Sequence, residues 1–240
     1  MKQFAVVGLS YFGKNVLEEL LELGADIMVI DLNRDAIDEY KDRPVSALVI
    51  DALNETSLRR ALPKTIDGVV IDMGDRIESS ILATSYCRKI GVSSIIVKAE
   101  TEEHAEILEL VGATKIVFPN REAAKRITPL MMSSAFLNYL PVSGKLVIAE
   151  LAVPAQLIGR TLLEANLRRK YGLNLISVKN ADEEYDFASP DYVFRAGDIA
   201  LVSGTDKSLA TFATMATKGA ARKAMPGLGD LSALFGFGKK

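Results

Sequence analysis

A glycine-containing loop near the start of the chain has the spacing of a phosphate-binding turn. The loop reads Gly8-Leu9-Ser10-Tyr11-Phe12-Gly13, and it lies between the apolar run Phe4-Ala5-Val6-Val7 and a helical pattern. It fits the motif Gly-x-Gly-x-x-Gly with Ser10 in the place of the middle glycine. The first glycine of that motif permits a tight turn, and the third permits close packing of helix on strand. The free amides at the helix N-terminus can then bind a phosphate group, so the loop predicts a nucleotide site.

Charged residues follow the later apolar runs, at the strand ends where a parallel sheet binds its ligand. Asp31 ends the second run, where an acidic side chain can accept hydrogen bonds from ribose hydroxyls. This acid disfavours a 2′-phosphate and therefore NADP. The alternative is that Asp31 only caps the turn that follows it. We expect further ligand contacts at the ends of this strand and the next three, from Leu32, Asn33, Asp51, Ala52, Met73, Gly74, Lys98, Ala99 and Glu100.

Lys98 is the one basic residue in this set, and two interpretations of it remain open. Its ammonium group could approach the phosphates as a point charge. It could equally form a surface salt bridge with Glu100 or Glu102.

Six short apolar runs alternate with helical patterns as far as residue 118. The runs are continuously apolar, as expected for strands buried on both faces of a parallel sheet. One helical pattern is closed by Gly24, and another is opened by Asn54, a good N-cap. The pattern predicts a doubly wound α/β domain of Rossmann-like type over residues 1–120. Its strands are expected at residues 4–7, 27–30, 47–50, 69–71, 95–97 and 116–118.

The pattern changes after Pro119. Residues 121–139 read as one long helical stretch that contains Pro129, so we expect a kink or a break into two helices over 121–140. Its apolar face is expected to pack on a neighbouring chain or, alternatively, on its own sheet. Residues 141–145 read as a linker to a small α+β domain at 141–216. That domain has expected helices near 161–167 and 206–216 and expected strands at 146–151, 174–178, 192–194 and 199–202. Residues 217–240 read as a disordered tail in which 228–237 could form an interfacial patch.

The composition limits the chemistry that the chain can perform. A net charge of −2 argues against nucleic acid as a partner, and no apolar run reaches the roughly 20 residues of a membrane span. The start of the chain has no room for a secretory leader, and the single Cys87 fits a reducing cytoplasm. Cys87 lies in a helical pattern that predicts a core position, and the single His104 is expected in a solvated or capping role. A Cys/His metal cluster is therefore excluded, and no catalytic set is visible, which favours binding without turnover.

Over about residues 1–215, the sequence resembles the cytoplasmic regulatory subunits of Trk/Ktr potassium-uptake systems. Such subunits carry an N-terminal RCK domain (regulator of potassium conductance) and a small RCK-C domain. The resemblance is carried by the segments 7–13, 29–33, 78–81, 96–100, 110–113, 166–172 and 195–198. It implies ATP, ADP or NAD(H) in the N-terminal cleft, and it identifies 121–139 with the family's crossover helices, which pair neighbouring subunits. It also implies an octameric ring beneath a membrane potassium channel, whose opening the nucleotide would control.

Three positions depart from the family pattern. Ser10 replaces a glycine, and its Cβ limits how closely the backbone approaches a phosphate. Tyr11 stands where many relatives have arginine. Asn120 stands where some members have an acidic residue that helps bind a divalent cation, and the nearby Glu122 is expected to point elsewhere. These changes favour ADP, AMP or NAD(H) over tightly bound ATP.

The second domain of several relatives binds cyclic di-AMP at a dimer interface. The matching residues here combine aliphatic side chains for the base with an arginine and an asparagine for polar contacts. They are Leu162, Leu163, Arg168, Asn174 and Pro190. The alternative is that they form ordinary core and dimer packing.

The sequence therefore predicts a cytoplasmic, nucleotide-binding subunit that gates a membrane potassium channel as a homo-oligomer. Two rivals remain: an NAD-dependent oxidoreductase, and a ligand-sensing module for another transporter. A change in nicotinamide absorbance that depends on a substrate would support the first rival. Co-purification with a membrane protein other than a potassium channel would support the second.

We predict that Asp31→Ala weakens nucleotide binding, because the ribose hydroxyls lose their acceptor. The dissociation constant measured by calorimetry tests this. Unchanged affinity for every nucleotide that binds would remove Asp31 from the site.

Overall fold

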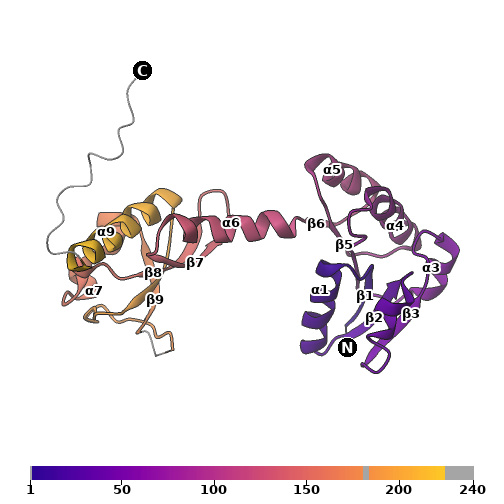
Figure 1. Cartoon of the computed structure of the whole chain (residues 1–240), viewed down its shortest axis with the longest axis horizontal. Helices are drawn as coiled ribbons and strands as arrows, with labels where there is room; N and C mark the ends of the chain where they lie inside the picture. The colour runs from indigo at the N-terminus through magenta and orange to yellow at the C-terminus, as the bar shows by residue number, and fades with distance from the viewer. Residues whose placement is uncertain (1, 181–183, 225–240) are drawn as a thin grey trace, which may run out of the picture. The chain divides into compact units, whose positions relative to one another are not determined.

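The protein divides into two compact units, Met1–Asn120 and Arg121–Lys240 (Figure 1). The structure is a computed structural model, and it describes residues 2–180 and 184–224. Each unit has its own sheet and its own hydrophobic core.

The first unit is a six-stranded parallel sheet with the order β3-β2-β1-β4-β5-β6. The chain forms β1, β2 and β3 while moving toward one edge of the sheet, and then it returns past β1 to form β4. The carboxyl ends of β1 and β4 therefore flank the switch point where such sheets bind ligands. The strands are β1 (Gln3–Val7), β2 (Asp26–Asp31), β3 (Val45–Val49), β4 (Gly68–Ile71), β5 (Ile95–Lys98) and β6 (Lys115–Val117).

Helices cover both faces of this sheet, which explains why its strands read as continuous apolar runs. Leu17 of α1 and Ile37 of α2 pack on one face. Leu58 of α3, Cys87 of α4 and Leu108 of α5 pack on the other. The helices are α1 (Tyr11–Glu22), α2 (Arg34–Asp38), α3 (Glu55–Ala61), α4 (Ile77–Ile90) and α5 (Glu102–Val111). The predicted Rossmann-like fold is confirmed.

The second unit is a small antiparallel sheet with the order β7-β8-β10-β9, and it confirms the expected α+β class. Its core contains the fully buried side chains of Phe194, Leu209 and Phe212. The strands are β7 (Phe136–Pro141), β8 (Val147–Ala152), β9 (Asn174–Lys179) and β10 (Ile199–Gly204). The helices are α6 (Pro119–Met132), which begins at the boundary of the units, η1 (Ala155–Leu157), α7 (Leu162–Ala165), α8 (Leu167–Tyr171) and α9 (Asp206–Ala224).

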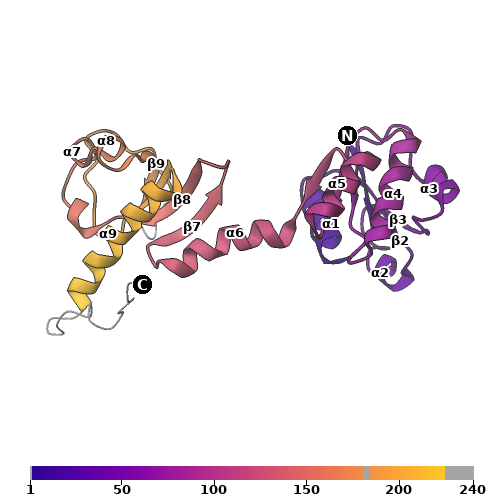
Figure 2. The ribbon, with the colours of Figure 1, turned by 90° about the horizontal axis from the view of Figure 1, so that it is seen from above.

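The prediction of a helix as far as residue 139 is wrong. Figure 2 shows α6 as one uninterrupted helix; Pro129 lies in its last turn and does not split it, and the helix ends at Met132. Ser133 then forms a local turn, because its hydroxyl accepts the Ala135 N–H at 3.3 Å and its carbonyl accepts the Phe136 N–H. Residues 136–141 form β7 instead. A bulge in β7 after Phe136 lets Phe136 and Tyr139, which are three positions apart, pack on the same core. Apolar residues three positions apart are also typical of one face of a helix, so this strand has the apolar spacing of a helix.

Several other expectations for the second unit are also corrected. Residues 142–146 are the turn between β7 and β8, not a linker between domains. The helix near 161–167 is two short helices separated by Asn166, which has a left-handed backbone (φ 46°). Val193 forms only an isolated bridge to Thr161, so 192–194 is not a strand. Helix α9 continues to Ala224 through the start of the expected tail, and residues 225–240, including the patch at 228–237, lie outside the described residues.

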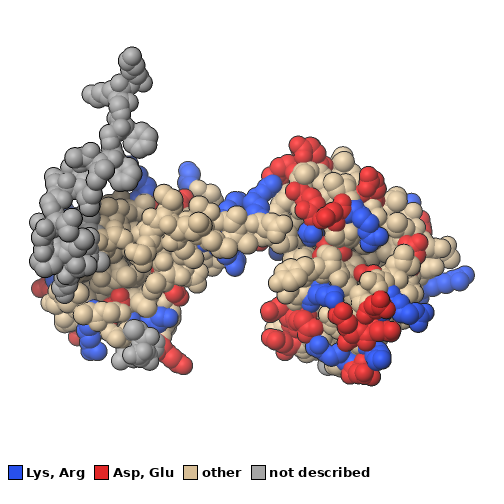
Figure 3. All heavy atoms as spheres, viewed as in Figure 1, with Lys and Arg blue, Asp and Glu red and all other residues tan. Residues whose placement is uncertain are grey.

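No helix in the described part of the chain is long and apolar enough to cross a membrane. Basic and acidic side chains alternate over the visible face of the first unit (Figure 3).

Candidate functional site

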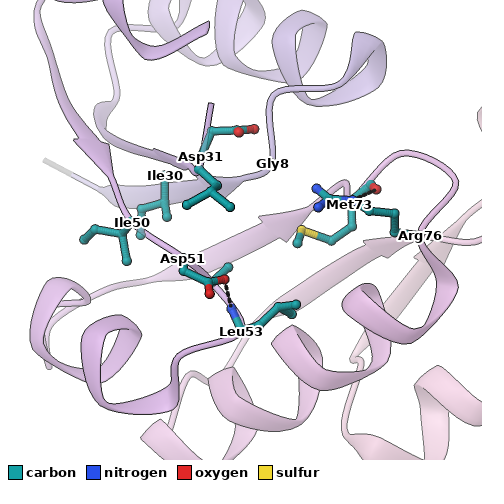
Figure 4. Close-up of a pocket in the computed structure, with 10 residues that line it drawn as sticks. Gly8, Ile30, Asp31, Ile50, Asp51, Leu53, Met73 and Arg76 are labelled. Carbon is teal, nitrogen blue, oxygen red and sulfur yellow. Dashed lines mark hydrogen bonds between the residues drawn. The ribbon is translucent and has the colours of Figure 1, made fainter. Parts of the chain in front are cut away.

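A cleft of about 110 Å³ lies at the carboxyl ends of β1 to β4 (Figure 4). Its wall combines aliphatic side chains, which suit a flat base, with two carboxylates and one guanidinium. It is lined by Gly8, Ile30, Asp31, Leu32, Ile50, Asp51, Ala52, Leu53, Met73 and Arg76. The structure thus brings together six predicted residues: Gly8, Asp31, Leu32, Asp51, Ala52 and Met73.

The glycine loop closes one side of the cleft, and its two end positions admit no side chain. Gly8 has φ +89°, and a Cβ there would lie 2.0 Å from the carbonyl oxygen of Asp72. A Cβ on Gly13 would lie 2.3 Å from the carbonyl oxygen of Gly8. These contacts confirm the reason for both glycines that the motif predicts: a tight turn, and a close approach of helix α1 to the sheet.

The carboxylate of Asp31 caps the turn that follows β2, which was one of the two alternatives, and it also lines the cleft. Its Oδ2 accepts the Leu9 N–H at 2.6 Å, and its Oδ1 accepts the Asn33 N–H at 2.8 Å. The carboxylate thus ties the glycine loop to the turn before α2, where Asn33 is the N-cap. Each oxygen keeps a second lone pair, and the side chain lines the cleft, so ribose hydroxyls can still donate to it.

Asp72 is the main site residue that sequence reasoning missed. It directly follows β4, is 1% exposed, and accepts the Gly13 N–H at 2.8 Å through Oδ2. The same oxygen accepts the Ser10 hydroxyl, while Oδ1 accepts the Gly74 N–H at 3.2 Å. A carboxylate at this end of α1 is favoured by the partial positive charge of the helix N-terminus. The sequence feature that could have identified Asp72 is its position directly after a buried parallel strand, which matches the position of Asp31 at the end of β2.

This arrangement explains how the loop accommodates Ser10. The hydroxyl of Ser10 bonds inward to Asp72, and Ser10 is not among the residues that line the cleft. Tyr11, the next residue, opens α1 with its side chain 86% exposed. The remaining predicted residues of this set belong to the surrounding turns and to the start of α1 rather than to the wall of the cleft: Leu9, Phe12, Gly13, Asn33 and Gly74.

Lys98 is held in an ion pair at the end of β5. Its Nζ lies 2.7 Å from Oε1 of Glu100 and 3.5 Å from Oδ1 of the buried Asp72. Burial acts to lower the pKa of Lys98, but the two carboxylates outweigh it, and the pKa is raised above its usual value. Lys98, Ala99 and Glu100 do not line the cleft. The structure thus contains the predicted salt bridge to Glu100.

His104 is buried, so the solvated alternative is wrong, whereas its ring does accept a backbone N–H just before α5. The ring is buried, its Nδ1 accepts the Glu100 N–H at 3.3 Å, and its Nε2 lies 2.7 Å from the hydroxyl of Ser80. Burial lowers the pKa of His104, against an opposing effect of Glu100, and favours the neutral ring. His104 thereby fixes the turn after β5. The expected core position of Cys87 is confirmed, and burial raises the pKa of its thiol to about 12.

A second, open groove of about 320 Å³ lies in the C-terminal unit. It brings together all five residues that the sequence analysis singled out there, Leu162, Leu163, Arg168, Asn174 and Pro190. Its other lining residues are Asn166, Leu167, Leu173 and Leu175. Leu163 is exposed, so the aliphatic wall of the groove is not closed within this chain.

Comparison with known proteins decides the family. Residues 4–119 match the model of the TrkA-N domain, and residues 146–216 match that of the TrkA-C domain. The chain is 33% identical to Ktr system potassium uptake protein C of Bacillus subtilis over 88% of this chain and 96% of that protein. The chain belongs to the Trk/Ktr family of potassium-uptake regulatory subunits. Ktr system potassium uptake protein A of Vibrio alginolyticus is a further relative, 30% identical over 87% of this chain and 95% of that one.

Solved structures show the same fold as this Trk/Ktr subunit. The RCK domain of the GsuK channel superposes with a TM-score of 0.63 and 19% identity, covering 90% of this chain and 47% of that one. The GsuK channel bound to NAD also gives 0.63, with 18% identity over 89% of this chain and 39% of that one. This chain therefore spans less than half the length of the channel chains with which it shares the RCK fold.

We predict that Asp72→Asn lowers the free energy of unfolding of the first unit by about 1–3 kcal/mol. The amide cannot accept all the hydrogen bonds of the carboxylate, and it leaves Lys98 without one of its charge partners. Chemical denaturation followed by circular dichroism measures the change. Asp75→Asn, an exposed acid in the same turn, is the matched control and should change stability by less than about 0.5 kcal/mol. Equal stability of the two variants would contradict the role given to Asp72.

Proposed function

We propose that this Trk/Ktr subunit binds an adenine nucleotide in the N-terminal cleft and thereby gates a membrane potassium channel or transporter. The observation that carries the proposal is the position of Asp31, which faces the cleft from the end of β2 while it holds the glycine loop. The relatives named as potassium uptake proteins support the transport role.

The geometry suits ADP, AMP or NAD(H). The ribose hydroxyls would donate to Asp31, and the base would lie among the aliphatic side chains of the cleft beside Asp51 and Ala52. The first amides of α1, at Tyr11 and Phe12, have no acceptor among the described residues, so they can donate to a phosphate. One solved relative of this fold is the GsuK channel bound to NAD. ATP fits less well, because Tyr11 offers no charge to a terminal phosphate.

The cleft supports binding rather than catalysis. Of its acidic groups, Asp31 accepts two backbone amides and Asp51 accepts the Leu53 N–H at 2.9 Å. Hydride transfer by an NAD-dependent oxidoreductase needs an acid or base placed beside a substrate. We therefore propose that the protein is not an enzyme.

Gating would follow from assembly. A ligand shifts a conformational equilibrium only by its different affinity for the two states. We propose a homo-oligomer, built from dimers into an octameric ring on the cytoplasmic side of the channel. Large apolar side chains stay exposed on α4, α5 and α6 within this chain, which supports such contacts. They are Leu82, Ile107, Leu110, Ile127, Met131 and Met132.

Cyclic di-AMP is our proposed ligand for the groove of the C-terminal unit. Its aliphatic side chains can contact the bases, and Arg168 and Asn174 can make polar contacts. The exposed Leu163 leaves room for a second subunit to complete the wall.

Calorimetric titration of the purified protein with ATP, ADP, AMP, NAD, NADH and cyclic di-AMP tests the proposal. We expect saturable binding of ADP, AMP or NAD(H) in the N-terminal cleft, and no consumption of the ligand. Binding by none of the six would leave a scaffold without a nucleotide signal and would contradict the proposal. Oxidation or reduction of the nicotinamide in the presence of a substrate would instead support the oxidoreductase.

A further inference from the structure

Arg76 places a positive charge in the wall of the nucleotide cleft, and it comes from the turn between β4 and α4. It is the N-cap residue of α4, and its side chain extends over Met73 toward Gly8 (Figure 4). Its Nε donates to the carbonyl of Met73 at 3.4 Å, which orients the guanidinium along the wall of the cleft. The group therefore approaches the end of the cleft that the glycine loop closes.

Two other cations close to the glycine loop, Lys98 and Lys14, are already paired. Lys98 is held by Glu100 and Asp72, and Lys14 of α1 lies 2.6 Å from Glu39. Tyr11, at the start of α1, carries no charge. Arg76, by contrast, forms no ion pair with any residue in the described part of the chain, although it lines the cleft together with two carboxylates. Among the residues that line the cleft, Arg76 is thus the cation whose charge is available to a ligand.

We propose that Arg76 determines the specificity of the cleft by binding a phosphate of the nucleotide. This inference rests on the proposed function. The phosphate is expected at the N-terminus of α1, and the guanidinium reaches toward that end from the opposite wall. A planar guanidinium can donate two parallel hydrogen bonds to phosphate oxygens, which the aliphatic side chains and carboxylates of the remaining wall cannot do.

Two consequences follow if Arg76 binds a phosphate of the ligand. Adenosine, which lacks phosphate, should bind without help from Arg76, whereas AMP and ADP should depend on it. The preference for ADP over adenosine should also weaken as salt is added, because an exposed guanidinium is screened by ions.

Calorimetric titration of the full-length protein with adenosine, AMP and ADP tests the inference, using the wild type, Arg76→Gln, Arg76→Lys and Arg60→Gln. Arg60 is an exposed arginine on α3 that does not line the cleft, so its variant makes the same change of charge elsewhere on the unit. We expect Arg76→Gln to raise the dissociation constant of ADP at least about tenfold and to leave that of adenosine within about twofold. Arg76→Lys should restore part of the affinity for ADP that Arg76→Gln loses. Arg60→Gln should bind ADP and adenosine as the wild type does.

The outcomes separate the inference from the proposed function. If the wild type binds ADP, and Arg76→Gln binds both ADP and adenosine as the wild type does, Arg76 does not bind the phosphate, while the nucleotide site stands. If Arg76→Gln loses adenosine and ADP equally, Arg76 supports the cleft but does not select the ligand, and the inference is overturned. If the wild type binds none of the three, the inference is overturned, and titration with NAD and NADH decides separately whether the proposed nucleotide site stands. Unchanged thermal unfolding of the variants confirms that they are folded.

Discussion

The cleft depends on one buried carboxylate, that of Asp72. From the end of β4 it holds the first turn of α1 through Gly13, the glycine loop through Ser10, and the ammonium group of Lys98 at the end of β5. A buried charge is tolerated only when it is paired and hydrogen-bonded, and here the strand ends and the helix N-terminus supply the partners. The charge therefore holds together three separate segments of the chain that surround the cleft.

Asp31 extends this organisation to β2. It joins the glycine loop to the turn before α2, while its side chain still faces the cleft. The loop is thus held by two carboxylates, one beneath α1 and one beside the expected ribose. Their backbone hydrogen bonds fix the loop before a ligand arrives, so binding does not need to order it. The proposed ligand would add negative charge at the end of the cleft beside the glycine loop, toward which the guanidinium of Arg76 extends.

The parallel sheet and the glycine loop could be predicted from the sequence because they depend on local features. Continuous apolar runs identify strands that are buried on both faces, and Gly8 and Gly13 are required by backbone contacts that the motif encodes. Asp72, His104 and β7 were missed because their environments are made by distant segments. Asp72 meets residues of the glycine loop, His104 meets Ser80 of α4, and a bulge gives β7 an apolar spacing that reads as helix. Arg76 lay among turn residues with no pattern to distinguish it.

The most direct test is an experimental structure of the protein with bound ADP. The account predicts that the ribose hydroxyls donate to Asp31 and that the phosphates lie between the first amides of α1 and the guanidinium of Arg76. ADP bound at another surface, or in this cleft with its phosphates directed away from α1, would contradict it.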